Sequence, residues 1–108
     1  MIFKKTFLRL KGYLRLRSAI KTADKQHALT GQRFYVIPMA GKRKMLVVTD
    51  RRNFRLLKLK HYIPSGASIA YLDAKCFYAT PYRNGSGKFS VKRIRVGRDN
   101  FMRWFMSR

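Results

Sequence analysis

The chain has 108 residues, enough for one small domain with its own hydrophobic core and too few for two. Hydrophobic residues make up 46% of the sequence and aromatic residues 14%, a composition that excludes wholesale disorder. There are 26 lysines and arginines against only 4 acidic residues, all aspartates, and the formal net charge is +22. Because the excess runs from Lys4 to Arg108, the folded body itself must be basic, which predicts a polyanionic partner.

The single cysteine, Cys76, excludes an intramolecular disulfide and a multi-cysteine zinc site, and it is most simply a small buried apolar residue. No apolar run is long enough for a transmembrane helix, and Arg9 and Lys11 interrupt what would otherwise be the apolar core of a secretory signal. We therefore expect the protein in the cytoplasm or within a nucleoprotein particle.

A basic amphipathic segment over residues 1–17 precedes a compact basic α+β domain over residues 18–108. Two periods compete in the segment. Helical spacing connects Phe3, Phe7, Leu10 and Leu14. A strand period instead places Leu8, Leu10, Leu14 and Leu16 in alternation with arginines and lysines. The segment is therefore open to both readings, and it could lie on a phosphate backbone, on a membrane surface, or in the core with its charges in water.

The next residues predict a helix and a hairpin. Residues 18–29 form the helix, with Ser18 as its N-cap and Gly31 as its stop. His27 falls in its last turn, where the helix dipole favours a cation. Two β-rich apolar runs, separated by a short glycine-containing link, then predict a hairpin over residues 32–49.

Asp50 stands where the N-cap of a helix over residues 51–60 belongs. Phe54 and Leu57 give that helix an apolar face, which Leu56 and Leu59 widen. Arginines and lysines occupy the remaining positions, as in a helix that packs on a sheet and turns its cations outward.

The last third of the chain is less regular. Residues 67–79 fit a short helix or a strand, and residues 80–88 form a loop rich in turn residues. Residues 89–97 have strand-like character because valines and isoleucine alternate with cations, although this segment too can be read two ways. Asp99 then caps a short helix, whose aromatic stripe is expected in the core: Phe101, Trp104 and Phe105.

These elements predict a single α+β domain. A small, mostly antiparallel sheet built on the 32–49 hairpin is covered by helices near 18–29 and 51–60, and the aromatic C-terminal helix closes the core.

No catalytic constellation is visible, because the four aspartates are well separated and two-metal chemistry needs clustered carboxylates. We therefore expect a non-enzymatic protein, without metal or cofactor, that binds DNA or RNA by neutralising phosphates and releasing counterions. A DNA-associated protein of phage or mobile-element type and a ribonucleoprotein component both fit. The alternative is a structural or scaffolding protein of a particle, or a cationic membrane-surface module.

Three places are expected to contact nucleic acid: the hairpin tip, the helix after Asp50 and the 82–88 loop. Consecutive cations at the tip repel one another unless an anion gathers them, and an aromatic side chain beside a cation in the loop suits stacking on a base. The candidate residues are Lys42, Arg43, Lys44, Arg51, Arg52, Asn53, Arg55, Lys58, Tyr82, Arg83 and Lys88.

Overall fold

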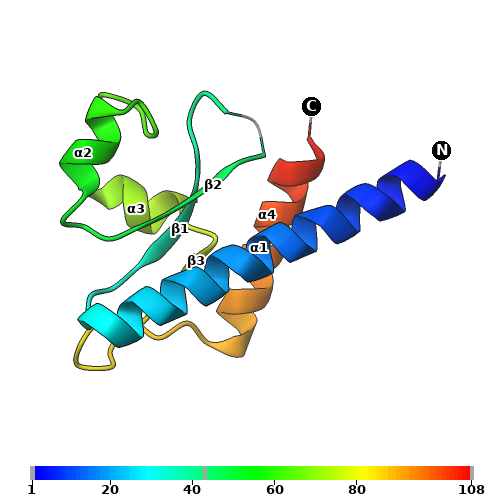
Figure 1. Ribbon diagram of the computed structural model, residues 1–108. Coiled ribbons are helices and arrows are strands. Elements are labelled where there is room, and N and C mark those ends of the chain that lie inside the picture. The colour runs from blue at the N-terminus through cyan, green and yellow to red at the C-terminus, as the bar shows by residue number, and fades with distance from the viewer. Residues whose placement is uncertain (1, 43, 108) are drawn as a thin grey trace.

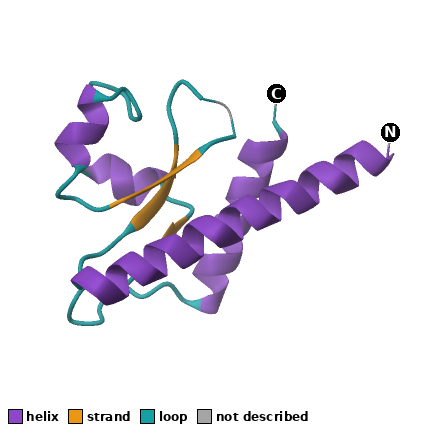
Figure 2. Ribbon diagram, in the orientation of Figure 1, coloured by secondary structure: helices purple, strands orange, loops and turns teal. Residues whose placement is uncertain are grey.

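A computed structural model describes residues 2–42 and 44–107 as an α+β domain with four helices and three strands (Figures 1 and 2). The elements in chain order are α1 (Ile2–Thr30), β1 (Tyr35–Pro38), β2 (Leu46–Thr49), α2 (Phe54–Leu59), α3 (Ala70–Lys75), β3 (Tyr78–Ala79) and α4 (Val91–Met106). The fold class predicted from the sequence is confirmed.

The sheet is antiparallel throughout and has the order β2-β1-β3. The predicted hairpin is its core: β1 pairs with β2, with Tyr35 opposite Thr49 and Pro38 opposite Leu46. On its other edge β1 pairs with the two-residue strand β3, where Tyr35 lies opposite Ala79. The central strand is therefore the one closest in sequence to α1.

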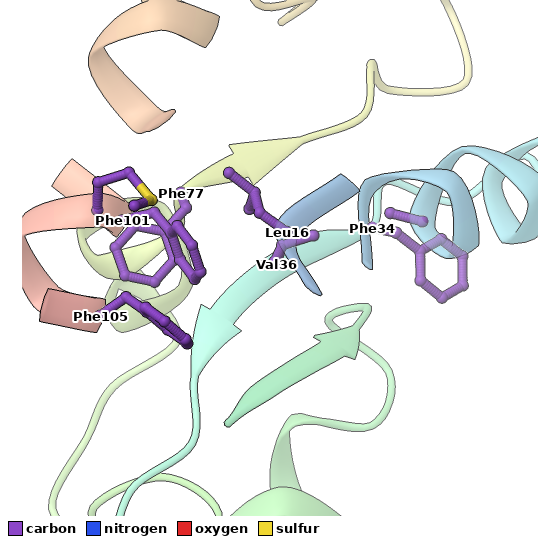
Figure 3. Packing of buried hydrophobic residues seen from close by; sticks show 8 residues of the cluster. Leu16, Phe34, Val36, Phe77, Phe101 and Phe105 are labelled. Carbon is purple, nitrogen blue, oxygen red and sulfur yellow. The ribbon is translucent and has the colours of Figure 1, made fainter. Parts of the chain in front are cut away.

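Successive side chains of a strand point to opposite faces, and in β1 both faces are buried. Phe34 and Val36 join a core with α1 and α4, in which Leu16, Phe101 and Phe105 are also buried (Figure 3). The second core lies on the other side of the sheet, beneath α2 and α3. Its buried members are Tyr35, Ile37, Val47, Leu57, Ile63, Leu72, Cys76 and Ala79.

Helix α1 is continuous from Ile2 to Thr30, so residues 2–17 adopt the helical alternative. Ser18 is not an N-cap as predicted: it lies within the helix, where its carbonyl accepts a hydrogen bond from Thr22 Oγ1. The predicted stop at Gly31 is confirmed, since its φ of +74° is left-handed and its N–H donates to the His27 carbonyl at 2.7 Å.

The helix after Asp50 is shorter than predicted and begins at Phe54. Asp50 does not cap it, because its Oδ1 closes the preceding turn by accepting from the backbone N–H of Asn53 at 3.1 Å and from the Asn53 side-chain amide at 2.7 Å. The widened apolar face is also wrong: Leu57 alone is buried in α2, and Leu59 is 72% exposed. The six-residue helix packs Leu57 and the half-buried Phe54 against the core, and Ile63 beyond the helix is buried in the same core.

Both readings of residues 67–79 occur in turn, as α3 and then β3, with the buried Cys76 between them as predicted. Of the two readings of residues 89–97, the strand is wrong, because α4 starts at Val91 and its N-cap is Ser90, whose Oγ accepts from the Arg93 N–H. Asp99 is accordingly an interior residue of α4 and not a cap. The two-residue strand β3 offers no long edge for a further strand, and Val91 stays 76% exposed.

The buried aromatic stripe of α4 is confirmed, and a glycine lets this helix approach the sheet. Phe101 and Phe105 are fully buried, and Phe77 packs edge-on against Phe101 with ring centroids 5.4 Å apart. Gly97 lies so close to Phe77 that a Cβ at this position would overlap the Phe77 carbonyl oxygen. The absence of a side chain at Gly97 therefore sets the distance between α4 and β3.

We expect Gly97→Ala to destabilise the fold by about 1–3 kcal/mol, because backbone atoms must shift to admit the methyl group. Helix propensity alone predicts the opposite sign, since alanine is favoured over glycine inside a helix. The measurement is the free energy of unfolding in urea. Gly66→Ala is the matched control, since a Cβ at Gly66 meets nothing within 4 Å. Equal stability of both variants would contradict the close approach of α4.

Candidate nucleic-acid interface

None of the lysines and arginines that the structure describes is buried. Within the same residues there is one ion pair, between Arg51 Nη2 and Asp73 Oδ2 at 3.1 Å. The positive charge is therefore carried on the surface of the folded body and is scarcely neutralised from within.

The hairpin tip is tied to the helices behind it. The Lys44 carbonyl accepts a hydrogen bond from Arg15 Nη1 at 2.7 Å, and the Lys44 Nζ lies 5.3 Å from the centroid of the Phe105 ring. Lys42 is exposed, and Arg43 lies outside the described residues. Of the predicted tip contacts, Lys42 is thus the described residue that faces solvent most freely.

Some of the candidates around α2 are exposed, and others are held by contacts within the fold. Arg52 and Arg55 are exposed, whereas the Asn53 amide is engaged by Asp50. Lys58 is half-buried, with its Nζ 5.5 Å from the centroid of the Phe54 ring. Arg52 and Arg55 are therefore the α2-side residues best placed to reach a phosphate.

Arg51 and Tyr82 come together in a polar cluster instead of facing solvent separately. Arg51 Nε donates to the Tyr35 hydroxyl at 3.0 Å, and Arg51 Nη2 donates to the Tyr82 hydroxyl at 2.9 Å as well as to Asp73. The Arg33 guanidinium carbon lies 4.5 Å from the centroid of the Tyr82 ring. Guanidinium groups thus already occupy the Tyr82 side chain, and the cluster fastens the 81–88 loop to the sheet.

The remaining loop candidates lie at its two ends. Arg83 Nη2 donates to the Thr30 carbonyl at 3.0 Å, which places a cation at the C-terminus of α1, where the helix dipole favours it. Lys88 is exposed. The loop is consequently anchored to α1 as well as to the sheet.

The pKa values of Cys76 and Tyr78 are shifted by burial and by local contacts. Burial raises the pKa of the Cys76 thiol, so it remains protonated and weakly nucleophilic at neutral pH. Burial also raises the pKa of Tyr78, and so does its hydrogen bond to Asp24, whose Oδ1 accepts from the Tyr78 hydroxyl at 2.7 Å. This bond links β3 to α1.

A groove between α1 and α4 contains residues that sequence reasoning missed. Tyr13, Arg17 and Lys21 follow one another at four-residue intervals on α1, and Ile94 and Arg98 do the same on α4. They line a groove of about 410 Å³, whose lining also includes the buried side chains of Leu16 and Phe77. The four-residue spacing of Tyr13, Arg17 and Lys21 can be recognised in the sequence only if residues 1–17 and 18–29 are read as one helix.

The described residues contain no group of three or more histidine, cysteine, aspartate or glutamate side chains that would hold a metal ion. Within the same part of the chain, no helix combines the length and the apolar character needed to cross a bilayer. Comparisons with known protein families, with curated proteins and with solved structures find no match.

We expect Arg51→Gln to lower the free energy of unfolding by about 1–3 kcal/mol, because the buried Tyr35 hydroxyl loses its donor. Arg52→Gln, its neighbour in sequence and an exposed cation, is the matched control and should leave stability within about 0.5 kcal/mol of the wild type. Denaturant unfolding of the two variants measures the difference. Equal stabilities would show that the cluster around Arg51 contributes nothing.

Proposed function

We propose that this protein binds nucleic acid without catalysis, through lysine and arginine side chains that neutralise phosphates. The observation that carries the proposal is a net charge of +22 on a folded body whose described cations all reach solvent, with Arg51 alone paired to a carboxylate among them. Such a surface repels itself, and a polyanion relieves that repulsion while releasing its own counterions.

The helices α1 and α4 offer the most extended basic surface. With 29 residues, α1 is about 43 Å long at 1.5 Å per residue, and it carries exposed cations from Lys4 to Lys25. Helix α4 packs against it and adds Lys92, Arg95 and Arg103. A backbone lying along α1 would meet charge over most of the longest dimension of the molecule, 45 Å, and would pass α4 where the two helices cross (Figure 1). The exposed candidates Lys42, Arg52, Arg55 and Lys88 lie outside these two helices and add further cations to the surface.

The deciding experiment is binding to labelled duplex DNA and to structured RNA across a salt series. We expect the logarithm of the affinity to fall linearly with the logarithm of salt concentration, with a slope near −0.9 per phosphate neutralised on B-DNA. The preferred nucleic acid separates a DNA-associated role from that of a ribonucleoprotein component. Absence of binding to both at moderate salt would overturn the proposal.

Charge variants locate the surface. Lys92→Gln with Arg95→Gln on α4 should reduce the magnitude of the salt slope by about 2, one for each phosphate that is no longer neutralised. Lys75→Gln removes a charge from α3, in the opposite layer, and serves as the control with an unchanged slope. If the α4 double variant and the α3 variant change the salt slope by the same amount, the interface lies elsewhere.

A membrane-surface or scaffolding role is a second candidate, and one observation favours it. Phe7, Leu10 and Leu14 form an exposed apolar stripe on α1, with Phe7 71% exposed. The stripe lies on the side of the helix away from the buried Gly12 and Leu16, near the end that extends past α4 in Figure 1. Cations flank it, as on a helix that lies in an anionic interface.

This second candidate predicts binding to vesicles containing anionic lipid, and loss of that binding when Phe7, Leu10 and Leu14 are all replaced by serine. Deleting residues 1–17 would be a poor test, because Gly12 and Leu16 are buried in the fold. Serine at Leu29 and Leu59, which are exposed apolar residues outside the stripe, is the control. Vesicle binding that survives the triple substitution would exclude the stripe as the membrane-binding surface.

A further inference from the structure

The groove between α1 and α4 combines an apolar interior with a cationic rim. Buried Leu16 and Phe77 meet half-buried Ile20 and the exposed edge of Ile94, and the rings of Tyr13 and Tyr78 also line the space. Its volume of about 410 Å³ falls within the roughly 300–1,000 Å³ of small-molecule sites. The interior therefore suits a flat apolar group of modest size.

The charges around this interior come from both helices. Arg17 and Lys21 stand on α1 and Arg98 on α4, and all three are exposed. Asp24, three residues after Lys21 on α1, accepts a hydrogen bond from the lining residue Tyr78 and keeps its negative charge, so the three cations beside the groove outnumber one carboxylate. The rim is thus positive on its two long sides, and its complement is a ligand with an apolar ring and adjacent negative charge.

We infer that this groove takes an unpaired nucleobase of a single-stranded nucleic acid, with the flanking phosphates on Arg17, Lys21 and Arg98. The inference rests on the proposed function and names the form of nucleic acid that the α1–α4 surface prefers. An unpaired base exposes the ring faces that a duplex keeps stacked, and aromatic and apolar side chains bind those faces with little sequence preference. A duplex would meet the rim cations but leave the apolar interior in contact with water.

The test compares two strands of equal charge. One is a labelled single strand of about ten nucleotides, within the span of common single-strand sites, and the other is the same sugar–phosphate strand without bases. We expect the wild-type protein to bind the base-containing strand roughly tenfold more tightly at the same salt concentration. The double variant Tyr13→Ser with Ile94→Gln should lose most of that preference and keep its salt slope, because it removes apolar contacts and no charge.

A matched control changes polarity on the same two helices outside the groove. Leu29→Ser with Val91→Gln alters two exposed apolar residues and should keep the wild-type preference for bases. Circular dichroism and thermal unfolding of both double variants establish that the fold is retained. A groove variant that remains folded and keeps the tenfold preference would overturn the inference.

The outcomes separate this inference from the proposed function. Equal affinity of the wild-type protein for both strands, with a steep salt dependence, would sink the groove inference and leave phosphate binding standing. Failure to bind either strand, duplex DNA or structured RNA would remove both. Vesicles of anionic lipid form the last arm: if their binding falls in the groove variant while strand binding does not change, the groove belongs to a lipid and the inference is wrong.

Discussion

The constraint on which the rest of the structure depends is that the central strand β1 has no solvent-facing side. Tyr35, Val36 and Ile37 are all fully buried, so a sheet of only three strands must be covered on both faces. Helices α1 and α4 supply one cover, and α2 and α3 the other. A chain of this length has few apolar residues to spare for two cores, and the long helix α1 can bury only the stripe that contains Gly12, Leu16 and Ala23. Its other faces carry most of its cations together with the exposed apolar residues Phe7, Leu10 and Leu14.

There is one carboxylate for every six or seven cations, so several arginines pack against aromatic rings and carbonyl oxygens instead of carboxylates. Arg15 lies over Phe105, Arg33 over Tyr82, and Arg93 over Phe89, with distances of 5.6, 4.5 and 4.4 Å to the ring centroids. Arg33 also donates to the carbonyls of Thr80 and Gly87. Aromatic faces and carbonyl oxygens attract a cation without neutralising it. The net charge consequently survives folding almost intact, and its compensation has to come from outside the chain.

How far the sequence predicts this fold depends on whether a signal is local. The hairpin was predictable because two apolar runs and a glycine turn lie within a few residues of each other, and so was the helix stop at Gly31. The start of α4 was not, because Val91, Ile94 and Val96 have strand propensity, and the close approach of Gly97 to Phe77 that lets a helix pack there is a tertiary contact. Asp50 is a residue type favoured at N-caps, yet its carboxylate accepts from the N–H of Asn53 in the turn that precedes α2.

In the candidate site, too, local signals and tertiary packing point to different residues. In the sequence, Tyr82, Arg51 and Lys44 have the appearance of free contact residues, but in the fold their side chains contact Arg33, Tyr35 and Phe105 respectively. The groove residues Arg17, Lys21 and Arg98 carry no local signature at all, since each is one cation among many on a helix. Only the packing of α1 against α4 puts them around a common apolar space. In a chain where cations are everywhere, position beside an apolar surface is therefore the criterion by which we choose candidate binding residues, and charge alone is not.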